Sequence, residues 1–168
     1  MVDRLFSLPR LARLYDPLAP DRRDLAAYIV MLEDLGARSV LDIGCGTGTF
    51  ALMLAQRGLS VIGLDPAKAS LDVARGKPGS ESVRWVQGEA ATPLKVSGDA
   101  VTMTGNVAHF AFPDGSLVTS SSTLRFRSRG EVLAGLIDAG FEPGEVRDAP
   151  DRPGQEFVFL ARRPHDSV

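Results

Sequence analysis

The fold of this 168-residue chain is decided by the stretch VLDIGCGTGTF, residues 40–50. A buried strand is predicted over 39–43 and a helix over 47–57, with glycines at 44, 46 and 48 between them. Glycine has no Cβ, so the backbone can turn tightly there and a ligand can lie directly against main-chain atoms. The stretch therefore predicts a strand, a ligand-binding turn and a helix in immediate succession.

The spacing of these glycines narrows the class of ligand. A dinucleotide-binding turn would have its third glycine at position 49, where this chain has Thr49. A P-loop would need Gly-Lys-Ser/Thr after a longer gap, and no lysine follows here. The G-x-G-x-G pattern thus disfavours phosphate binding, and a dinucleotide oxidoreductase stays a distant alternative.

Strands and helices alternate on both sides of the glycine turn. Further strands are predicted at 59–64, 82–86 and 99–104, and further helices at 21–35 and 66–75. This alternation is typical of parallel βαβ units, which place ligands at the carboxyl ends of their strands. We therefore predict an α/β fold with a mostly parallel sheet and helices on both faces.

The two ends of the chain carry different signals. Three prolines in residues 1–20 predict at most a short helix within 5–14, followed by the turn-rich Tyr15-Asp16-Pro17 segment of an arm or lid. Near the other end, Ser128 and Glu131 predict a capping box and Gly140 a helix end. Two last strands are expected at 141–147 and 156–161, before a frayed tail at 164–168.

Composition limits the partners of the chain. The formal charge is -2, from 19 basic and 21 acidic residues, so no broad positive field is available for nucleic acid or an anionic membrane. No apolar run approaches the roughly 20 residues of a membrane span, and the first residues lack the apolar core of a secretion signal. The lone cysteine, Cys45, excludes an intrachain disulfide and agrees with a reducing compartment. We expect a cytoplasmic protein with a small-molecule partner.

Residues 41–48 resemble motif I of class I S-adenosylmethionine-dependent methyltransferases. Asp65 stands 21 residues after Gly44, where the acidic residue of this family accepts hydrogen bonds from both ribose hydroxyls. The Gly-Glu-Ala turn at 88–90 is similar to the family's Gly-Asp-Ala turn, whose acidic side chain faces the adenine amino group. Residues 103–109 resemble the segment beneath the methionine end, and Tyr15-Asp16 resembles the arm that closes over the cofactor.

The resemblance implies a Rossmann-like, doubly wound fold with an antiparallel last strand, and S-adenosylmethionine as cofactor. It implies a single cofactor-binding domain over 21–163. The cofactor-binding residues that it implies are Tyr15, Asp42, Gly44, Cys45, Gly46, Gly48, Asp65, Pro66, Glu89, Ala90, Thr104, Gly105 and Asn106.

Several of these residues have an alternative interpretation. Asp65 would also suit the cap of a helix that begins at Pro66. Tyr15 would also suit ordinary packing, and Cys45 between two glycines suits a small filler of the turn better than a nucleophile. His109, five residues after the fourth strand, is either a general base or a solvated side chain.

The implied reaction needs little covalent help from the protein. The methyl group of a sulfonium is already activated, so proximity and alignment can supply roughly 7 to 11 kcal/mol of the barrier reduction. A hydroxyl or protonated amine acceptor would need a base, for which His109 is the first candidate. The acceptor is expected to be a small molecule.

The resemblance weakens after the fourth strand. Residues 105–127 are too few for the family's helix and parallel fifth strand, and 112–116 reads as a turn. We therefore expect that helix and strand to be missing, with 117–126 as the arm of a hairpin. An unpaired apolar edge invites another chain, which predicts a homodimer with 117–126 at its interface. The alternative function is a cofactor-binding remnant or regulatory module without turnover.

Overall fold

The computed structural model describes residues 4–18, 20–89, 98–104, 110–111, 117–118, 127–149, 153–154 and 156–164. The chain forms two compact units, Met1–Ser122 and Thr123–Val168. Among the described residues, none of the helices is long and apolar enough to cross a membrane.

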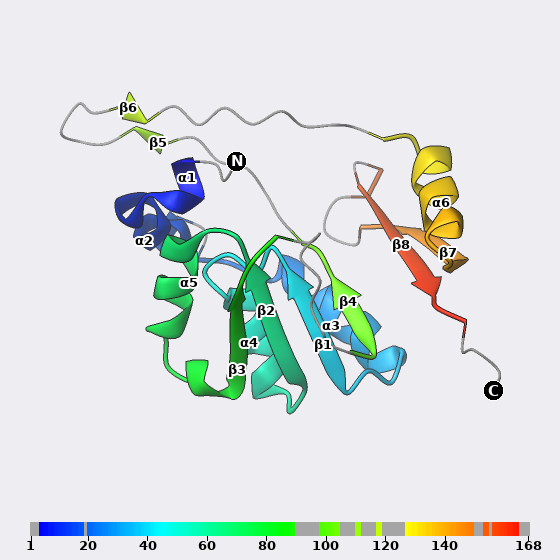
Figure 1. Ribbon diagram of the computed structural model, residues 1–168, viewed down its shortest axis with the longest axis horizontal. Helices are drawn as coiled ribbons and strands as arrows, with labels where there is room; N and C mark the ends of the chain where they lie inside the picture. The colour runs from blue at the N-terminus through cyan, green and yellow to red at the C-terminus, as the bar shows by residue number, and fades with distance from the viewer. Residues whose placement is uncertain are drawn as a thin grey trace. The chain divides into compact units, whose positions relative to one another are not determined.

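The first unit is built on a parallel sheet of four strands in the order β3-β2-β1-β4 (Figure 1). The strands are β1 (Ser39–Ile43), β2 (Ser60–Asp65), β3 (Val83–Gln87) and β4 (Ala100–Thr102). All three pairings between neighbours are parallel, as βαβ units require. The predicted α/β class with a mostly parallel sheet is confirmed.

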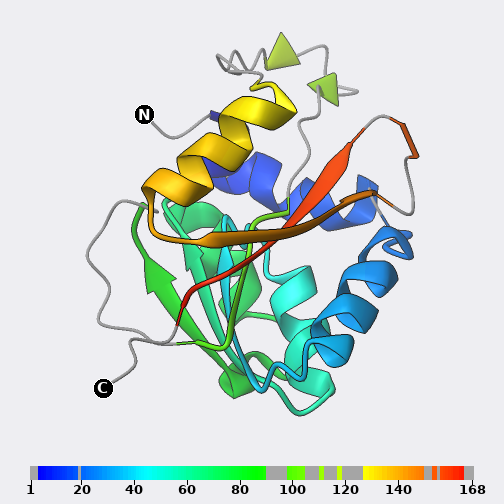
Figure 2. The ribbon, with the colours of Figure 1, turned by 90° about the vertical axis from the view of Figure 1, so that its right-hand side faces the viewer.

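Helices α3 (Asp24–Asp34) and α4 (Thr49–Gln56) cover the same side of this sheet (Figure 2). Apolar residues of α3 recur at helical spacing, and that face packs with α4 and the strands into one core. The buried members of the core are Leu25, Ile29, Leu32, Val40, Phe50, Ala51, Leu52, Leu54, Val61 and Val83. This core fixes the two elements that flank the glycine turn.

Local signals determine where α3 ends. Gly36 has a φ of +67°, and its N–H donates to the Glu33 carbonyl while the N–H of Ala37 donates to that of Leu32. These two bonds form a Schellman motif, which satisfies the last carbonyls of the helix. The predicted end of this helix is confirmed.

Helix α5 (Lys68–Arg75) starts two residues later than predicted. Ala67 is in an extended conformation, and its N–H donates to Asp65 Oδ1 at 2.7 Å. Because this bond closes a turn around Pro66, the prediction that Pro66 begins the helix was wrong. A short 3-10 turn, η1 (Ser80–Ser82), then leads into β3.

The N-terminal arm is more helical than the prolines suggested. It contains α1 (Arg4–Ser7) and α2 (Pro9–Leu18), so the predicted turn at Tyr15-Asp16-Pro17 was wrong. Pro9 occupies the first position of α2, where a helix needs no donor, and Pro17 lies in the last turn. Leu11 and Ala12 are fully buried, and both helices contact α5, so packing outweighs the cost of Pro17.

The segment after β4 holds a short antiparallel pair, β5 (Phe110–Ala111) with β6 (Leu117–Val118). The hairpin expected here is therefore present in the described residues. The expected absence of a helix and a fifth strand concerns mainly residues 105–109, 112–116 and 119–126, which lie outside the described residues.

The second unit contains α6 (Arg129–Asp138) and the antiparallel strands β7 (Glu142–Asp148) and β8 (Phe157–Arg162). The predicted capping box is confirmed: Ser128 Oγ accepts from the Glu131 N–H, and Glu131 Oε2 accepts from the Ser128 N–H at 2.7 Å. Gly140, with a φ of +81°, ends the helix as predicted. The antiparallel last strand is confirmed as β8.

Candidate functional site

The glycine-rich loop, residues 44–48, joins β1 to α4 with three residues in the left-handed region. The φ values are +73° at Gly44, +55° at Gly46 and +78° at Gly48. A Cβ added at Gly44 or Gly46 would meet no described atom within 4 Å, so both Cα atoms face open space. A ligand can therefore lie against the backbone at these two positions, as the sequence predicted.

The first three amide groups of the loop are already bonded to β2. The N–H groups of Gly44 and Cys45 donate to the Leu64 carbonyl at 2.8 and 3.2 Å, and the N–H of Gly46 donates to Asp65 Oδ2 at 2.8 Å. A phosphate-binding loop presents such donors to its ligand. In this loop, these three N–H donors are bonded to the protein itself, which agrees with the prediction against phosphate.

Asp65, the last residue of β2, is only 7% exposed. Its Oδ2 accepts from Gly46 and its Oδ1 from Ala67, the residue just before α5. Burial raises the pKa of Asp65, and the two backbone hydrogen bonds oppose that rise. Each carboxylate oxygen has a second lone pair, so the helix-starting contact and ligand binding are compatible roles.

Asp42 lies in β1, two residues before the loop, and is 1% exposed. The hydroxyl of Thr102 donates to its Oδ1, while Oδ2 has no hydrogen-bond partner among the described residues. Burial, together with the charge of Asp65, raises the pKa of Asp42 to about 7. Two acidic groups thus flank the loop, which favours cationic or hydroxyl-bearing ligands over anionic ones.

The Trp85 ring lies against the loop at Gly48. A Cβ at Gly48 would clash with this ring, and a Cβ at Gly63 would lie 2.7 Å from it. Gly63 and Trp85 are register partners on β2 and β3, and the indole N–H donates to the Ser80 carbonyl at 3.0 Å. Glycine is therefore needed at position 48 because the Trp85 ring leaves no room for a Cβ, whereas Gly44 and Gly46 border open space.

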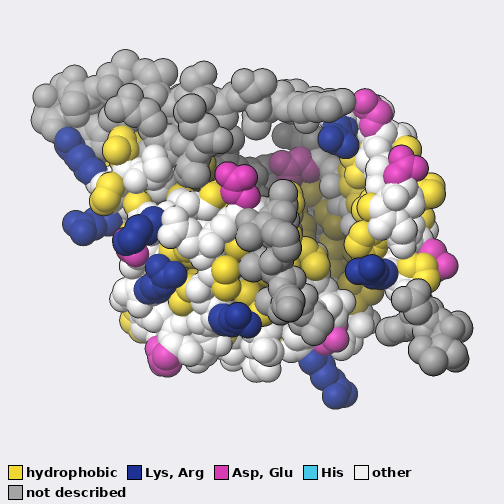
Figure 3. All heavy atoms as spheres, viewed as in Figure 1, with side chains coloured by type: hydrophobic (Ala, Val, Ile, Leu, Met, Phe, Trp, Pro, Cys, Tyr) yellow, Lys and Arg dark blue, Asp and Glu magenta, His cyan; other side chains and the backbone are white. Residues whose placement is uncertain are grey.

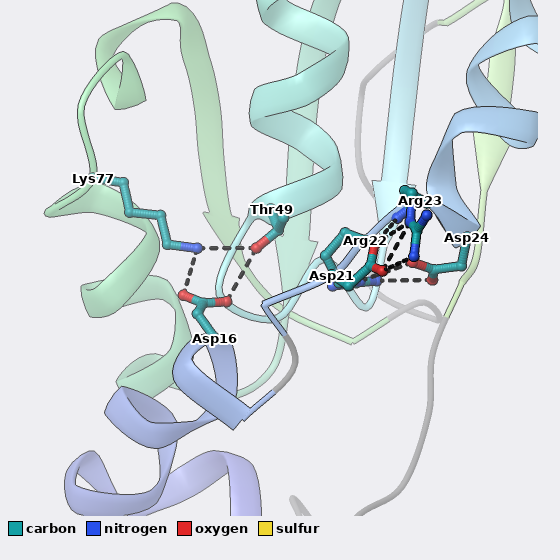
Figure 4. A network of polar contacts seen from close by, with 7 residues as sticks. All are labelled: Asp16, Asp21, Arg22, Arg23, Asp24, Thr49 and Lys77. Atoms are coloured by element: carbon teal, nitrogen blue, oxygen red, sulfur yellow. Dashed lines mark hydrogen bonds and ion pairs between the residues drawn. The ribbon is translucent and has the colours of Figure 1, made fainter.

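A polar network ties the N-terminal arm to the loop and to the start of α4. Figure 4 shows its contacts among Asp16, Thr49 and Lys77. Asp16 Oδ1 accepts from the hydroxyls of Thr47 at 2.7 Å and Thr49 at 3.1 Å, and Lys77 Nζ lies 2.7 Å from Asp16 Oδ2. Lys77 Nζ also donates to Thr49 Oγ1 at 3.1 Å. Burial raises the pKa of Asp16, but the contacts with Lys77 and the two threonines outweigh it and hold that pKa below its usual value.

Three further predicted residues lie close to this loop or in the arm. Cys45 is buried, and burial followed by the charges of Asp42 and Asp65 raises the pKa of its thiol, which agrees with a filler rather than a nucleophile. Pro66 lies in the turn between β2 and α5. Tyr15 packs near Phe6, with ring centroids 6.1 Å apart.

The other predicted residues follow β3 and β4. Glu89 is exposed after β3, and the N–H of the preceding Gly88 donates to the Asp65 carbonyl at the end of β2 at 3.1 Å. Thr104 is half-buried after β4. Ala90, Gly105, Asn106 and His109 lie outside the described residues.

Sequence reasoning missed four residues that shape this site: Asp16, Thr47, Lys77 and Trp85. Asp16 follows Tyr15 in the segment that resembles the family's arm, and Thr47 lies between two glycines of the loop pattern. Their positions in these two motifs could have marked both as site residues. Lys77 and Trp85 had no such signal, because their contacts join positions far apart in the sequence.

Comparisons with known proteins agree with this geometry. A family model described as "Methyltransferase domain" matches residues 40–125. The cypemycin N-terminal methyltransferase of Streptomyces sp is 34% identical over 88 residues, which are 52% of this chain and 36% of that protein. The chain thus spans about a third of the length of this curated relative.

Two solved structures show the same fold. A TehB-like SAM-dependent methyltransferase from Corynebacterium glutamicum is 23% identical with a TM-score of 0.64, covering 94% of this chain and 100% of its own. SAM-bound CalS10, an amino pentose methyltransferase from Micromonospora echinaspora, is 20% identical with a TM-score of 0.62, covering 84% and 90%.

Proposed function

The chain belongs to the family of methyltransferase domains, and we propose that it binds S-adenosylmethionine at the glycine-rich loop and transfers a methyl group to a small molecule. One observation carries the proposal: an open glycine loop, with its first three amides bonded to β2, is flanked by the two acidic residues Asp42 and Asp65. This combination suits a nucleoside with a cationic amino-acid tail and disfavours a phosphate.

The residues present fit this cofactor. Open space at Gly44 and Gly46 gives the ligand direct access to the backbone. Asp65 keeps lone pairs for a vicinal diol, and the unpartnered Oδ2 of Asp42 provides an acceptor for a cationic group. We further propose that Glu89 and Ala90 contact the adenine, that Thr104, Gly105 and Asn106 line the methionine end, and that Tyr15 belongs to the lid.

When bound, S-adenosylmethionine supplies a methyl group already activated on a sulfonium. The protein then has to hold donor and acceptor in line and keep water out, which can account for roughly 7 to 11 kcal/mol of the barrier. For a hydroxyl or protonated amine acceptor, we propose that His109 takes the proton.

A small-molecule acceptor is favoured by the surface charge. On the face shown in Figure 3, the Lys and Arg side chains of the described residues are spread among acidic and apolar ones. A protein that follows a nucleic-acid backbone needs clustered positive charge, and the net charge here is -2.

The test is calorimetric titration followed by a turnover assay. S-adenosylmethionine and its demethylated product are expected to bind, whereas NAD and ATP are not. Methylation of one member of a panel of hydroxyl, amine and thiol acceptors would establish turnover. Tighter binding of NAD than of S-adenosylmethionine would overturn the proposal, and binding without any turnover would leave a cofactor-binding module.

We also propose that the chain is a homodimer. Among the described residues β4 pairs only with β1, and the exposed side chains of Val101 and Met103 lie at that end of the sheet. Such an edge can pair with a second chain, with residues 117–126 contributing to the interface. Light scattering at several concentrations should give twice the monomer mass, and a monomeric mass throughout would exclude the dimer.

A cytoplasmic location is proposed from cysteine usage. The lone Cys45 is a free, buried thiol, and a chain without disulfides is suited to a reducing compartment. Fractionation of cells that express the protein should recover it with cytoplasmic markers, and recovery with membranes would contradict the proposal.

A further inference from the structure

We propose that Asp16 and Lys77 are positioning residues, which hold the N-terminal arm (residues 4–18) on the glycine-rich loop and thereby set the affinity of the loop for its cofactor. The inference rests on the proposed function, because it concerns the same site. The contacts that carry it join three segments: α2, the loop with the start of α4, and the residues after α5.

Thr47 is the residue through which the arm reaches the loop. It is buried between the two positive-φ residues Gly46 and Gly48, and its hydroxyl donates to Asp16. The neighbouring Gly46 N–H donates to Asp65 on the other side. The loop is therefore held from two directions, by the carboxylate expected to bind ribose and by the carboxylate of the arm.

Glycine-rich turns depend on such anchors. Gly44 and Gly46 have access to more backbone conformations than other residues, so ordering them costs more entropy. A loop that is ordered before the ligand arrives binds with less loss of freedom. Removing the bond between Asp16 and Thr47 should therefore weaken cofactor binding even where the loop still folds.

Lys77 keeps Asp16 charged and in place. Its side chain is 22% exposed and that of Asp16 is 32% exposed. The pairs Lys68–Asp72 and Arg57–Glu33 are about half exposed or more, so salt and water weaken them more strongly. The Asp16–Lys77 pair also joins distant segments, which Lys68–Asp72 does not.

The arm has other anchors that keep it folded without this pair. Leu11 and Ala12 are buried, and Ser70 Oγ donates to the Phe6 carbonyl at 3.1 Å. Substitution of Asp16 or Lys77 should therefore release Thr47 without unfolding the unit. By linkage, a cofactor that binds better to the ordered loop must also strengthen docking of the arm.

The experiment measures S-adenosylmethionine affinity by calorimetry in wild type, Asp16→Ala, Lys77→Ala and Lys77→Arg, with Lys68→Ala as the matched control. We expect about tenfold weaker binding in Asp16→Ala and Lys77→Ala, within the usual range of coupling between sites. Lys77→Arg keeps the charge and should recover most of the affinity. Lys68→Ala removes another lysine of the same region and should bind as wild type does.

A second readout reports the arm itself. Arg13 is exposed on α2, so trypsin cleavage after Arg13, followed by mass spectrometry, measures arm opening. S-adenosylmethionine should slow this cleavage in wild type and much less in Lys77→Ala. Circular dichroism melts confirm that each variant is folded, and Asp16→Ala serves if Lys77→Ala does not fold.

Wild-type affinity in folded Asp16→Ala and Lys77→Ala, with unchanged cleavage after Arg13, would overturn the inference and leave the proposed function intact. A wild-type protein that does not bind S-adenosylmethionine would instead refute the proposed function, and this inference with it.

Discussion

Thr102 of β4 donates a hydrogen bond of 2.9 Å to Asp42, its register partner on β1, whose carboxyl group is almost completely buried. The other oxygen of Asp42 has no partner among the described residues. With a pKa of about 7, raised by burial and by Asp65, this carboxyl is protonated in about half of the molecules at neutral pH. A buried carboxyl that titrates near neutrality makes both stability and ligand binding depend on pH.

The first prediction is that Asp42→Asn removes a pH-dependent loss of stability. Between its ordinary pKa of 3.8 and about 7, the folded chain holds a proton that the unfolded chain releases, so the free energy of unfolding falls as pH rises. Over that range the loss amounts to roughly 3 to 4 kcal/mol. Urea unfolding of wild type and Asp42→Asn should be measured between about pH 4 and about pH 8. Any excess in the free energy of unfolding of the wild type over that of Asp42→Asn should shrink or reverse as pH rises. Identical pH slopes would contradict this prediction.

The second prediction is that S-adenosylmethionine binding releases a proton and strengthens as pH rises toward 8. A cationic group near Asp42 favours its ionised form, so ligand binding lowers the pKa of Asp42. Below about pH 7 the affinity should fall by up to about tenfold per pH unit. Calorimetry in two buffers of different ionisation enthalpy measures the released proton. Asp42→Asn should release none, whereas equal release by both proteins would assign the proton to another group.

The third prediction is that Asp65→Ala weakens S-adenosylmethionine binding by about 1.5 to 3 kcal/mol, the scale of hydrogen bonds to a charged group. The substitution removes the partner of the Gly46 N–H as well as the acceptor for the ribose. Calorimetric titration measures the loss, with Asp72→Ala on the exposed face of α5 as the control. Unchanged affinity in a well-folded Asp65→Ala would limit Asp65 to its structural contacts with Gly46 and Ala67.

The fourth prediction separates packing from backbone strain at Trp85. Gly63→Ala should destabilise the fold by about 1 to 3 kcal/mol, because its Cβ would meet the indole at 2.7 Å. Gly48→Ala should cost about 2 to 4 kcal/mol, since it adds a left-handed φ of +78° to a similar clash. Trp85 is the sole tryptophan, so its fluorescence follows urea unfolding directly.

Gly58→Ala is the matched control for backbone strain. Its φ is +85°, but an added Cβ would meet no described atom within 4 Å. Gly48→Ala should therefore be the more destabilising of the two. Equal losses at Gly48 and Gly58 would show that the packing of Trp85 against the loop contributes little.

The sequence alone was sufficient wherever local chemistry decides the structure. Strand 39–43, the glycine-rich turn at 44–48, the end of α3 next to Gly36 and the capping box at Ser128 were all predicted at the residues where they occur. Each depends on residues within a few positions of one another. The position of Asp65 at the end of the second strand was also predictable, because parallel βαβ units bring strand ends together.

Only the tertiary structure decided which side chains meet at the loop. In the structure, the segment Tyr15-Asp16-Pro17, expected as a turn, belongs to the end of α2. Burial of Leu11 and Ala12 outweighs the cost of a proline in the last turn of this helix. The tertiary structure also placed Asp16 against Thr47 and Lys77, set Trp85 beneath Gly48 and left one oxygen of Asp42 without a partner among the described residues. Such contacts follow from how packed elements bring distant residues together, and neither hydrophobic periodicity nor motif spacing contains that information.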